Sequence, residues 1–245
     1  MPYSAPHSIS LSRWIVTAIT AAGVSFSASA ASAAQIAEWN FDDGTANDSV
    51  GGYDLSAVGT GPTISSGIAT FDGNDALPSY LETSGYGGSS TWSVSMRIRA
   101  GSPIDQGVFQ GIFSNNSGST ENNSWQLENY GGVYQFRTVN AASPFTVGAA
   151  TGGWDTIVIR KNGADGDVWL NGVQVVSSFG VNPGGLQNFR LGTNRNSNRF
   201  YHFDADWFKV YDSHEDPQLI PEPSAALLIG LGLAAMSQAR TRRTS

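Results

Sequence analysis

Hydrophobic and polar residues alternate strictly over residues 91–99, which read TWSVSMRIR. Trp92, Val94, Met96 and Ile98 fall on one side of this pattern, and serine and arginine residues fall on the other. Successive side chains of a β-strand point to opposite faces, so a period of two indicates a strand with one buried face. The segment is therefore predicted to be a strand of an antiparallel sheet.

Similar short patterns recur through residues 35–216, separated by clusters of Gly, Asn, Asp and Ser. Residues 168–175 are predicted to form a hairpin, because Asn171-Gly172 readily adopts the positive φ angles of a type I′ turn. No 3.6-residue period persists for three helical turns, so two packed antiparallel sheets and an all-β fold are predicted. Further strands are predicted at residues 38–41, 68–71, 79–82, 108–113, 124–127, 133–137, 156–160, 188–191 and 206–211.

The composition supports this fold class and excludes several functions. The chain has 245 residues with 29 Gly and 13% charged residues, which is unlike a helical bundle or a coiled coil. A formal net charge of −7 argues against a nucleic-acid binder, which needs clustered Lys and Arg. The absence of cysteine excludes disulfides, zinc–thiolate sites and thiol catalysis. No linker or repeat divides residues 35–216, which are predicted to be one domain.

Residues 1–34 have the three parts of a secretory signal peptide. Arg13 precedes an apolar stretch at residues 14–24, and a run of small residues then leads to Ala33 and Ala34. This order is typical of a signal helix that is removed after export. We therefore expect signal peptidase to cut after Ala34 or Ala33; a buried N-terminal helix is the alternative.

Residues 217–245 have the features of a second targeting segment. A Pro-Glu-Pro motif precedes an apolar stretch at residues 224–239 and a basic tail. As a helix this stretch would be about 24 Å long, short of the ~30 Å hydrocarbon core, and the basic tail favours the cytoplasmic side. The motif residues are Pro221, Glu222 and Pro223, and the tail arginines are Arg240, Arg242 and Arg243.

This terminus closely resembles the PEP-CTERM sorting signal of Gram-negative bacteria, which is also labelled an ice-binding protein C-terminal domain. The resemblance implies recognition by an exosortase, with cutting near the Pro-Glu-Pro motif. It further implies transient anchoring in the inner membrane and release to the surface or extracellular matrix of cells that produce exopolysaccharide and form biofilms. An ordinary C-terminal membrane anchor is the alternative.

Seven short motifs follow one another between residues 37 and 212. They are the strand at 38–43, the loop at 47–52, the Phe-Asp-Gly segment at 71–75, the strand at 92–96, the strand from Gly153 to Arg160, the hairpin at 169–173 and the closing segments at 191–192 and 206–211. Their order resembles a laminin G-like, concanavalin A-like domain of bacterial surface proteins, although a usual His is absent from the fifth. The resemblance implies an antiparallel jelly-roll β-sandwich. It implies no single function, because this fold hosts lectins, hydrolases and spacers.

No catalytic residue is predicted, and the protein is expected not to be an enzyme. The nearest approach to a glycosidase motif is Asp204-Ala205-Asp206, but the next alternating position holds Phe208 instead of a third acid. His202 and His214 are the imidazole bases left after signal removal, and no nucleophile elbow accompanies them. A divergent glycoside hydrolase stays as an alternative.

One structural Ca²⁺ is predicted as a cofactor. Ca²⁺ takes six to eight oxygen ligands, and domains of the resembled class often carry one such ion beside an Asp of the closing strand. Asp206 occupies that position, and Asp42 and Asp48 are its predicted partners near the opening strand. The alternative is that these acids cap turns or face solvent.

A carbohydrate site is predicted from two loops rich in Asn and Ser, at residues 114–124 and 194–198. Sugar binding uses aromatic faces beside amide groups at the rim of a sheet. The candidate ligand-binding residues are Trp125, Tyr130, Tyr134, Tyr201 and Asn194. The alternative is that the aromatic residues belong to the core and that the loops are solvated connectors.

These features predict an exported, non-catalytic surface or matrix protein that binds polysaccharide or another cell-surface component. A structural spacer without a small ligand is the first alternative, and the hydrolase is the second. Nucleic acid is not expected as a partner.

Overall fold

The computed structural model describes residues 34–73, 76–83, 90–103, 108–115 and 125–214. All regular secondary structure within these residues is β-strand. The strands are β1 (Gln35–Trp39), β2 (Ser56–Gly59), β3 (Thr63–Ser65), β4 (Ile68–Asp72), β5 (Ser79–Glu82), β6 (Trp92–Ala100), β7 (Gln110–Asn115), β8 (Trp125–Tyr130), β9 (Val133–Thr138), β10 (Phe145–Ala149), β11 (Trp154–Asn162), β12 (Asp165–Leu170), β13 (Val173–Val176), β14 (Phe189–Leu191) and β15 (His202–Tyr211). The predicted all-β class is confirmed for this part of the chain.

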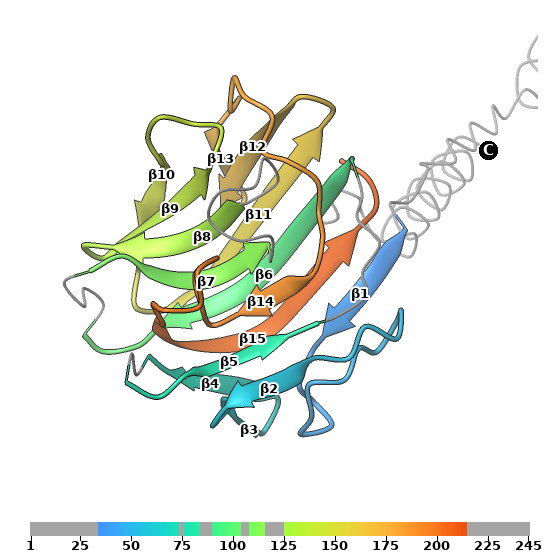
Figure 1. Ribbon diagram of the computed structural model, residues 1–245, viewed down its shortest axis with the longest axis vertical. Coiled ribbons are helices and arrows are strands. Elements are labelled where there is room, and N and C mark those ends of the chain that lie inside the picture. Colours follow the sequence, from blue (N-terminus) through green and yellow to red (C-terminus); the bar gives the residue numbers. More distant parts are fainter. Residues whose placement is uncertain (1–33, 74–75, 84–89, 104–107, 116–124, 215–245) are drawn as a thin grey trace, which may run out of the picture. The chain divides into compact units, whose positions relative to one another are not determined.

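The strands form two antiparallel sheets, which Figure 1 shows as two layers. The eight-stranded sheet has the order β13-β12-β11-β6-β15-β4-β3, and β1 also pairs with β15. The seven-stranded sheet has the order β10-β9-β8-β7-β14-β5-β2. Consecutive strands pair in several hairpins, such as β8 with β9, whereas other neighbours come from distant parts of the sequence, as in the pairing of β6 with β15.

Aromatic side chains from both sheets fill the space between them. They belong to a single cluster of buried residues, and most of its large members are fully buried. Because the rings pack face to face or edge to face, the two layers form a β-sandwich with one core. The ring contacts that join the sheets, measured between centroids, include Trp92 with Trp125 at 4.7 Å, Trp39 with Phe189 at 5.6 Å and Phe113 with Phe208 at 6.0 Å.

The strongest sequence patterns are confirmed. Trp92, Val94, Met96 and Ile98 are all fully buried on one face of β6. The predicted hairpin is β12–β13, where Asn171 and Gly172 have φ angles of 50° and 79°. The other predicted strands also form; β5 has the predicted bounds and the others have shifted ends.

Three strands were not predicted, namely β2, β3 and β10. β2 and β3 lie at or near sheet edges and are mostly exposed, so neither has a buried face that would produce an alternating pattern. β10 is also an edge strand, and its pairing with β9 shifts at Thr146–Gly148, which interrupts the period of two.

The predicted signal helix at residues 1–34 falls almost wholly outside the described residues, and so do the sorting motif, the apolar stretch at 224–239 and the basic tail. In the part of the chain that is described, no helix has the length and apolar character needed to cross a membrane.

The carboxylate of Asp165 joins the start of β12 to residues 178–180. It accepts hydrogen bonds from the hydroxyl of Ser178 at 2.6 Å and from the backbone N–H groups of Phe179 and Gly180 at 2.7 and 3.1 Å. These donors, Ser178 foremost, hold the pKa of Asp165 below its ordinary value of 3.8. Since the folded-state pKa is depressed, the stabilisation is present above pH 3.8 and is lost as the pH falls through the folded-state value.

We therefore expect Asp165→Asn to lower the free energy of unfolding by about 1–2 kcal/mol at neutral pH, since hydrogen bonds to a charged acceptor are lost at a largely solvated site. Urea unfolding at pH 7 and at pH 3 measures this difference, which should shrink at the lower pH. A difference between variant and wild type that stays constant over this range would show that the charge of Asp165 contributes nothing.

Candidate functional site

Three of the predicted sugar-binding aromatics lie in the core. Trp125, Tyr134 and Tyr201 are fully buried, so their predicted placement at the surface is wrong. Trp125 and Tyr134 occupy the inward positions of β8 and β9, and Tyr201 lies just before β15. The hydroxyl of Tyr134 donates to the carboxylate of Asp155 at 3.1 Å, and burial raises the pKa of Tyr134 well above its ordinary value.

The two other predicted residues lie in different places. Tyr130 ends β8 and is 51% exposed. Asn194 follows β14, is 2% exposed, and closes a turn by bonding Asn198 through both its amide oxygen and its amide nitrogen. Most of the other predicted loop, residues 116–124, lies outside the described residues.

The three acids predicted to bind Ca²⁺ each have other surroundings. Asp48 accepts four backbone hydrogen bonds, from Glu38 and from three residues of its own loop. Asp206 forms an ion pair with Arg97 at 2.6 Å, and the exposed Asp42 lies beside Gly67. Among the described residues, no three His, Asp or Glu side chains are grouped so that they could hold a metal ion. Calcium binding therefore stays a prediction, and this ligand set is not brought together.

Asp204 and Asp206, the nearest match to a glycosidase motif, are both neutralised by arginines. Asp204 accepts from Arg99 at 2.5 Å and from the hydroxyl of Thr70 at 2.7 Å, whereas Asp206 pairs with Arg97. Both guanidinium groups also lie over the ring of Trp154: that of Arg97 is 5.2 Å and that of Arg99 is 4.8 Å from the ring centroid. These cross-strand contacts form a row of paired side chains on the outer face of the eight-stranded sheet, where they have a structural role.

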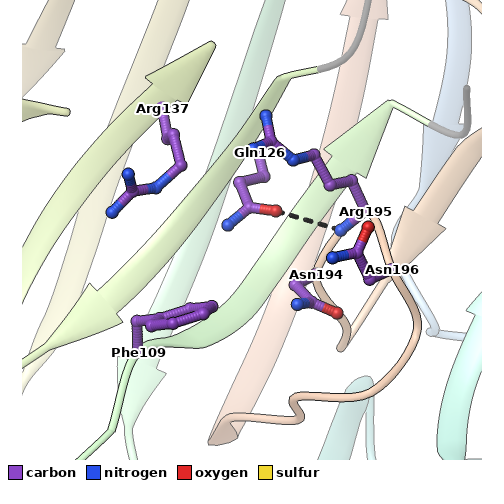
Figure 2. A pocket seen from close by; sticks show the side chains of 6 residues that line it. All are labelled: Phe109, Gln126, Arg137, Asn194, Arg195 and Asn196. Carbon is purple, nitrogen blue, oxygen red and sulfur yellow. Dashed lines mark hydrogen bonds between the residues drawn. The ribbon is translucent and has the colours of Figure 1, made fainter. Parts of the chain in front are cut away.

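A pocket of about 160 Å³ opens on the outer face of the seven-stranded sheet. Figure 2 shows Phe109 and Arg137 on one side of Gln126, while Asn194, Arg195 and Asn196 lie on the loop at its other side. Phe109 precedes β7, and Gln126 and Arg137 come from β8 and β9. An exposed aromatic ring, three amides and two guanidinium groups therefore surround one hollow.

The loop of this pocket, residues 192–201, is fixed against β7. The backbone N–H of Gly192 donates to the carbonyl oxygen of Ile112 at 2.7 Å, and Phe200 forms an isolated bridge with Gly111. A Cβ atom at Gly111 would lie 1.9 Å from the backbone nitrogen of Asn194. Only glycine permits so close an approach, so Gly111 sets the distance between the loop and the sheet.

A buried carboxylate orients the polar groups of the pocket. Glu128 is fully buried on β8 and accepts from Nε and Nη2 of Arg137 at 2.9 and 2.8 Å. Its other oxygen accepts from the amide nitrogen of Gln126. The amide oxygen of Gln126 then accepts from the backbone N–H of Arg195 at 3.0 Å (Figure 2). The network thus fixes Arg137, Gln126 and the loop relative to one another.

The Arg195 side chain extends from the loop over the strand that carries Gln126 (Figure 2). Its Nη1 atom is buried and has no hydrogen-bond partner among the described residues. Burial lowers the pKa of Arg195, the nearby charge of Arg137 lowers it further, and Glu128 acts in the opposite direction. The pocket therefore holds a guanidinium whose charge is incompletely compensated.

Of the six residues that line this pocket, the sequence predicted Asn194 by name and Arg195 and Asn196 only as part of a loop, and it did not indicate the other three. Gln126 and Arg137 occupy the outward positions of strands that were predicted, so the alternation placed them on a solvent face without distinguishing them from other polar residues. Arg195 and Asn196 lie inside the predicted Asn-rich loop. Phe109 precedes β7 and is 40% exposed, which no local pattern indicated.

No family description and no curated protein matches this chain. Solved structures with a similar fold include the binding domain of botulinum neurotoxin DC in complex with SialylT, at 14% identity and a TM-score of 0.53 over 75% of this chain. Domain 4 of AbnA, a GH43 extracellular arabinanase from Geobacillus stearothermophilus solved with arabinotriose, matches at 17% identity and a TM-score of 0.54 over 76% of this chain. This chain covers 49% of the toxin structure and 96% of the arabinanase domain. The likeness is one of fold, a β-sandwich that carbohydrate-binding domains also adopt.

Proposed function

We propose that this protein is an exported, non-catalytic surface or matrix protein whose jelly-roll, concanavalin A-like β-sandwich binds carbohydrate. The observation that carries the proposal is the pocket on the seven-stranded sheet, where the exposed ring of Phe109 lies beside amide and guanidinium donors. An aromatic ring can pack against the apolar face of a sugar, while a few convergent polar groups fix its hydroxyls.

The similar solved structures support this proposal at the level of fold. The arabinanase domain is described in complex with arabinotriose, and another neurotoxin structure, of type C, is described with a dependence of cell entry on two ganglioside molecules. Both descriptions concern carbohydrate-bearing ligands, and neither protein exceeds 17% identity to this chain. Since a fold alone hosts many functions, the pocket has to carry the assignment.

The cellular part of the proposal comes from the two ends of the sequence. A signal peptide at residues 1–34 would deliver the chain across the inner membrane, and the Pro221–Glu222–Pro223 motif would present it to an exosortase. The sandwich would then act outside the cell, on polysaccharide or another surface component of a Gram-negative bacterium.

A glycan and exopolysaccharide array with the purified full chain tests this function, and Phe109→Ala tests the pocket. We expect Phe109→Ala to weaken binding at least tenfold, because the loss of an aromatic anchor typically costs more than about 1.4 kcal/mol. Tyr130 stays a predicted ligand-binding residue: Gln110 pairs with Asn129, so Tyr130 and Phe109 come next at the same edge of the β7–β8 pair, and Tyr130→Ala should weaken binding less than Phe109→Ala. Val173→Ala removes an exposed side chain from the other sheet and serves as a control.

Repeating the array in calcium and in chelator tests the predicted calcium ion separately from the pocket.

Loss of binding in Tyr130→Ala but not in Phe109→Ala would move the site to the β8–β9 hairpin. Silence of a folded protein toward every glycan would overturn the carbohydrate function and favour a structural spacer.

A further inference from the structure

The charges that face the pocket do not balance. Arg137 is neutralised by Glu128, and Arg190, which donates to the backbone oxygen of Arg195, is neutralised by Glu82 at 3.2 Å. Arg195 forms no ion pair among the described residues. Within the described part of the chain one guanidinium charge is therefore left over, although the net charge of the full sequence is −7.

Unsatisfied hydrogen-bond donors lie at the same place. Nη1 of Arg195 is buried without a partner, and the hydroxyl of Ser114, which lies opposite Gln126 on β7, is also buried without one among the described residues. A buried donor that is left unpaired costs about 1–3 kcal/mol, so such groups in a native protein call for a partner. An incoming acceptor group would satisfy Arg195.

We propose that the pocket binds a carboxylated sugar residue and that Arg195 holds its carboxylate; this inference rests on the carbohydrate-binding function proposed above. A planar guanidinium matches the two oxygens of a carboxylate, and hydrogen bonds between charged groups are about twice as strong as neutral ones. A neutral sugar could accept a hydrogen bond from Arg195 but would leave its charge uncompensated. The acidic remainder of the protein would repel anions elsewhere and so confine their binding to this pocket.

The size of the pocket suits one such residue. Its volume of about 160 Å³ is below the ~300–1,000 Å³ of sites that enclose a drug-sized ligand. A single acidic sugar of a longer chain would place its carboxylate at Arg195 and its ring near Phe109, and the exposed Asn196 would be available to its hydroxyls. The rest of the polysaccharide would extend into solvent.

Two matched probe pairs test this inference with the purified full chain. Oligogalacturonate and its methyl ester share one sugar backbone and differ in the charge and the added methyl group at the carboxyl, and sialyllactose and lactose differ by one acidic sugar. We expect the acidic member of at least one pair to bind at least tenfold more tightly and its affinity to fall with added NaCl, because salt screens exposed charges. The pair that responds distinguishes a uronate source from a sialate source.

Arg195→Gln should remove this preference for the acidic member and lower affinity for the neutral one far less. Arg97→Gln makes the same charge change on the outer face of the other sheet and should have no effect. Thermal unfolding checks that both variants fold; if Arg195→Gln does not, Arg195→Lys should fold and retain only part of the preference, since lysine has the charge without the planar fork.

Equal affinity for both members of each pair, unaffected by Arg195→Gln, would overturn the carboxylate inference and leave the carbohydrate function standing. Failure of the folded protein to bind any of the four probes or any glycan of the array would overturn both.

Discussion

Trp125→Ala is expected to lower the free energy of unfolding by about 3–5 kcal/mol, the usual cost of replacing a buried tryptophan. Trp125 is fully buried and stacks on Trp92 of the opposite sheet at 4.7 Å and on Phe113 of the neighbouring strand at 5.4 Å. Its removal would leave a cavity at the centre of the sandwich, with partner rings on both sides. Urea unfolding followed by circular dichroism measures the change.

Tyr130→Ala is the matched control, because it removes an aromatic side chain from the other end of the same strand. Tyr130 is 51% exposed, so this variant should unfold within about 0.5 kcal/mol of the wild type. A folded Trp125→Ala protein that had lost only glycan binding would contradict the placement of Trp125 in the core.

Gly111→Ala is expected to have the second large effect, on both stability and binding. Its Cβ would lie 1.9 Å from the nitrogen of Asn194, an atom of the backbone, so the loop at residues 192–201 must move. Overpacking of this kind costs about 1–3 kcal/mol. Because the loop carries Asn194, Arg195 and Asn196, we also expect glycan affinity to fall at least tenfold in the same array format.

Gly153→Ala is the control for this change. Neither glycine has a positive φ angle, and a Cβ at Gly153 meets nothing closer than the hydroxyl oxygen of Thr151 at 3.5 Å. Its stability and glycan affinity should match those of the wild type. Wild-type binding by a stable Gly111→Ala protein would mean that the loop does not shape the site.

The two outer faces of the β-sandwich differ in how their arginines are paired. Two arginines of the eight-stranded sheet, Arg97 and Arg99, lie over Trp154 and are each paired with an aspartate, so they stabilise that surface. On the face of the seven-stranded sheet Arg137 is paired in a similar way, but Arg195, on the loop after β14, has no carboxylate partner among the residues that the structure describes. This difference in charge compensation is what marks one face as a candidate binding surface.

The positions of the strands were predictable where one face of a strand is buried. The alternation at residues 92–98 predicted which side chains of β6 enter the core, and Asn171-Gly172 predicted the turn between β12 and β13. The edge strands β2, β3 and β10 were not predictable in this way, because exposed or irregular strands place no period of two in the sequence.

The candidate site was less predictable than the fold. Trp125 and Tyr134 follow the same alternation as other core residues, but their neighbouring Asn-rich loops suggested the surface. Aromatic residues serve cores and sugar sites equally well by composition, and only their depth separates the two roles. The carboxylate of Asp48 accepts hydrogen bonds from backbone N–H groups, and these donors are brought together only when the loop folds.

The sequence by itself determined the all-β class, the main strands, the hairpin and the side of β6 that enters the core, because these follow from local periodicity and turn chemistry. Only the tertiary structure decided that Phe109, Gln126, Arg137 and Arg195 meet in one pocket, since they come from three strand regions and a loop up to 86 positions apart. It also decided which charges are compensated, because Glu128 reaches Arg137 across a strand pair while Arg195 finds no carboxylate among the described residues. Contacts of this kind depend on which strands become neighbours, and that is a property of the whole sandwich.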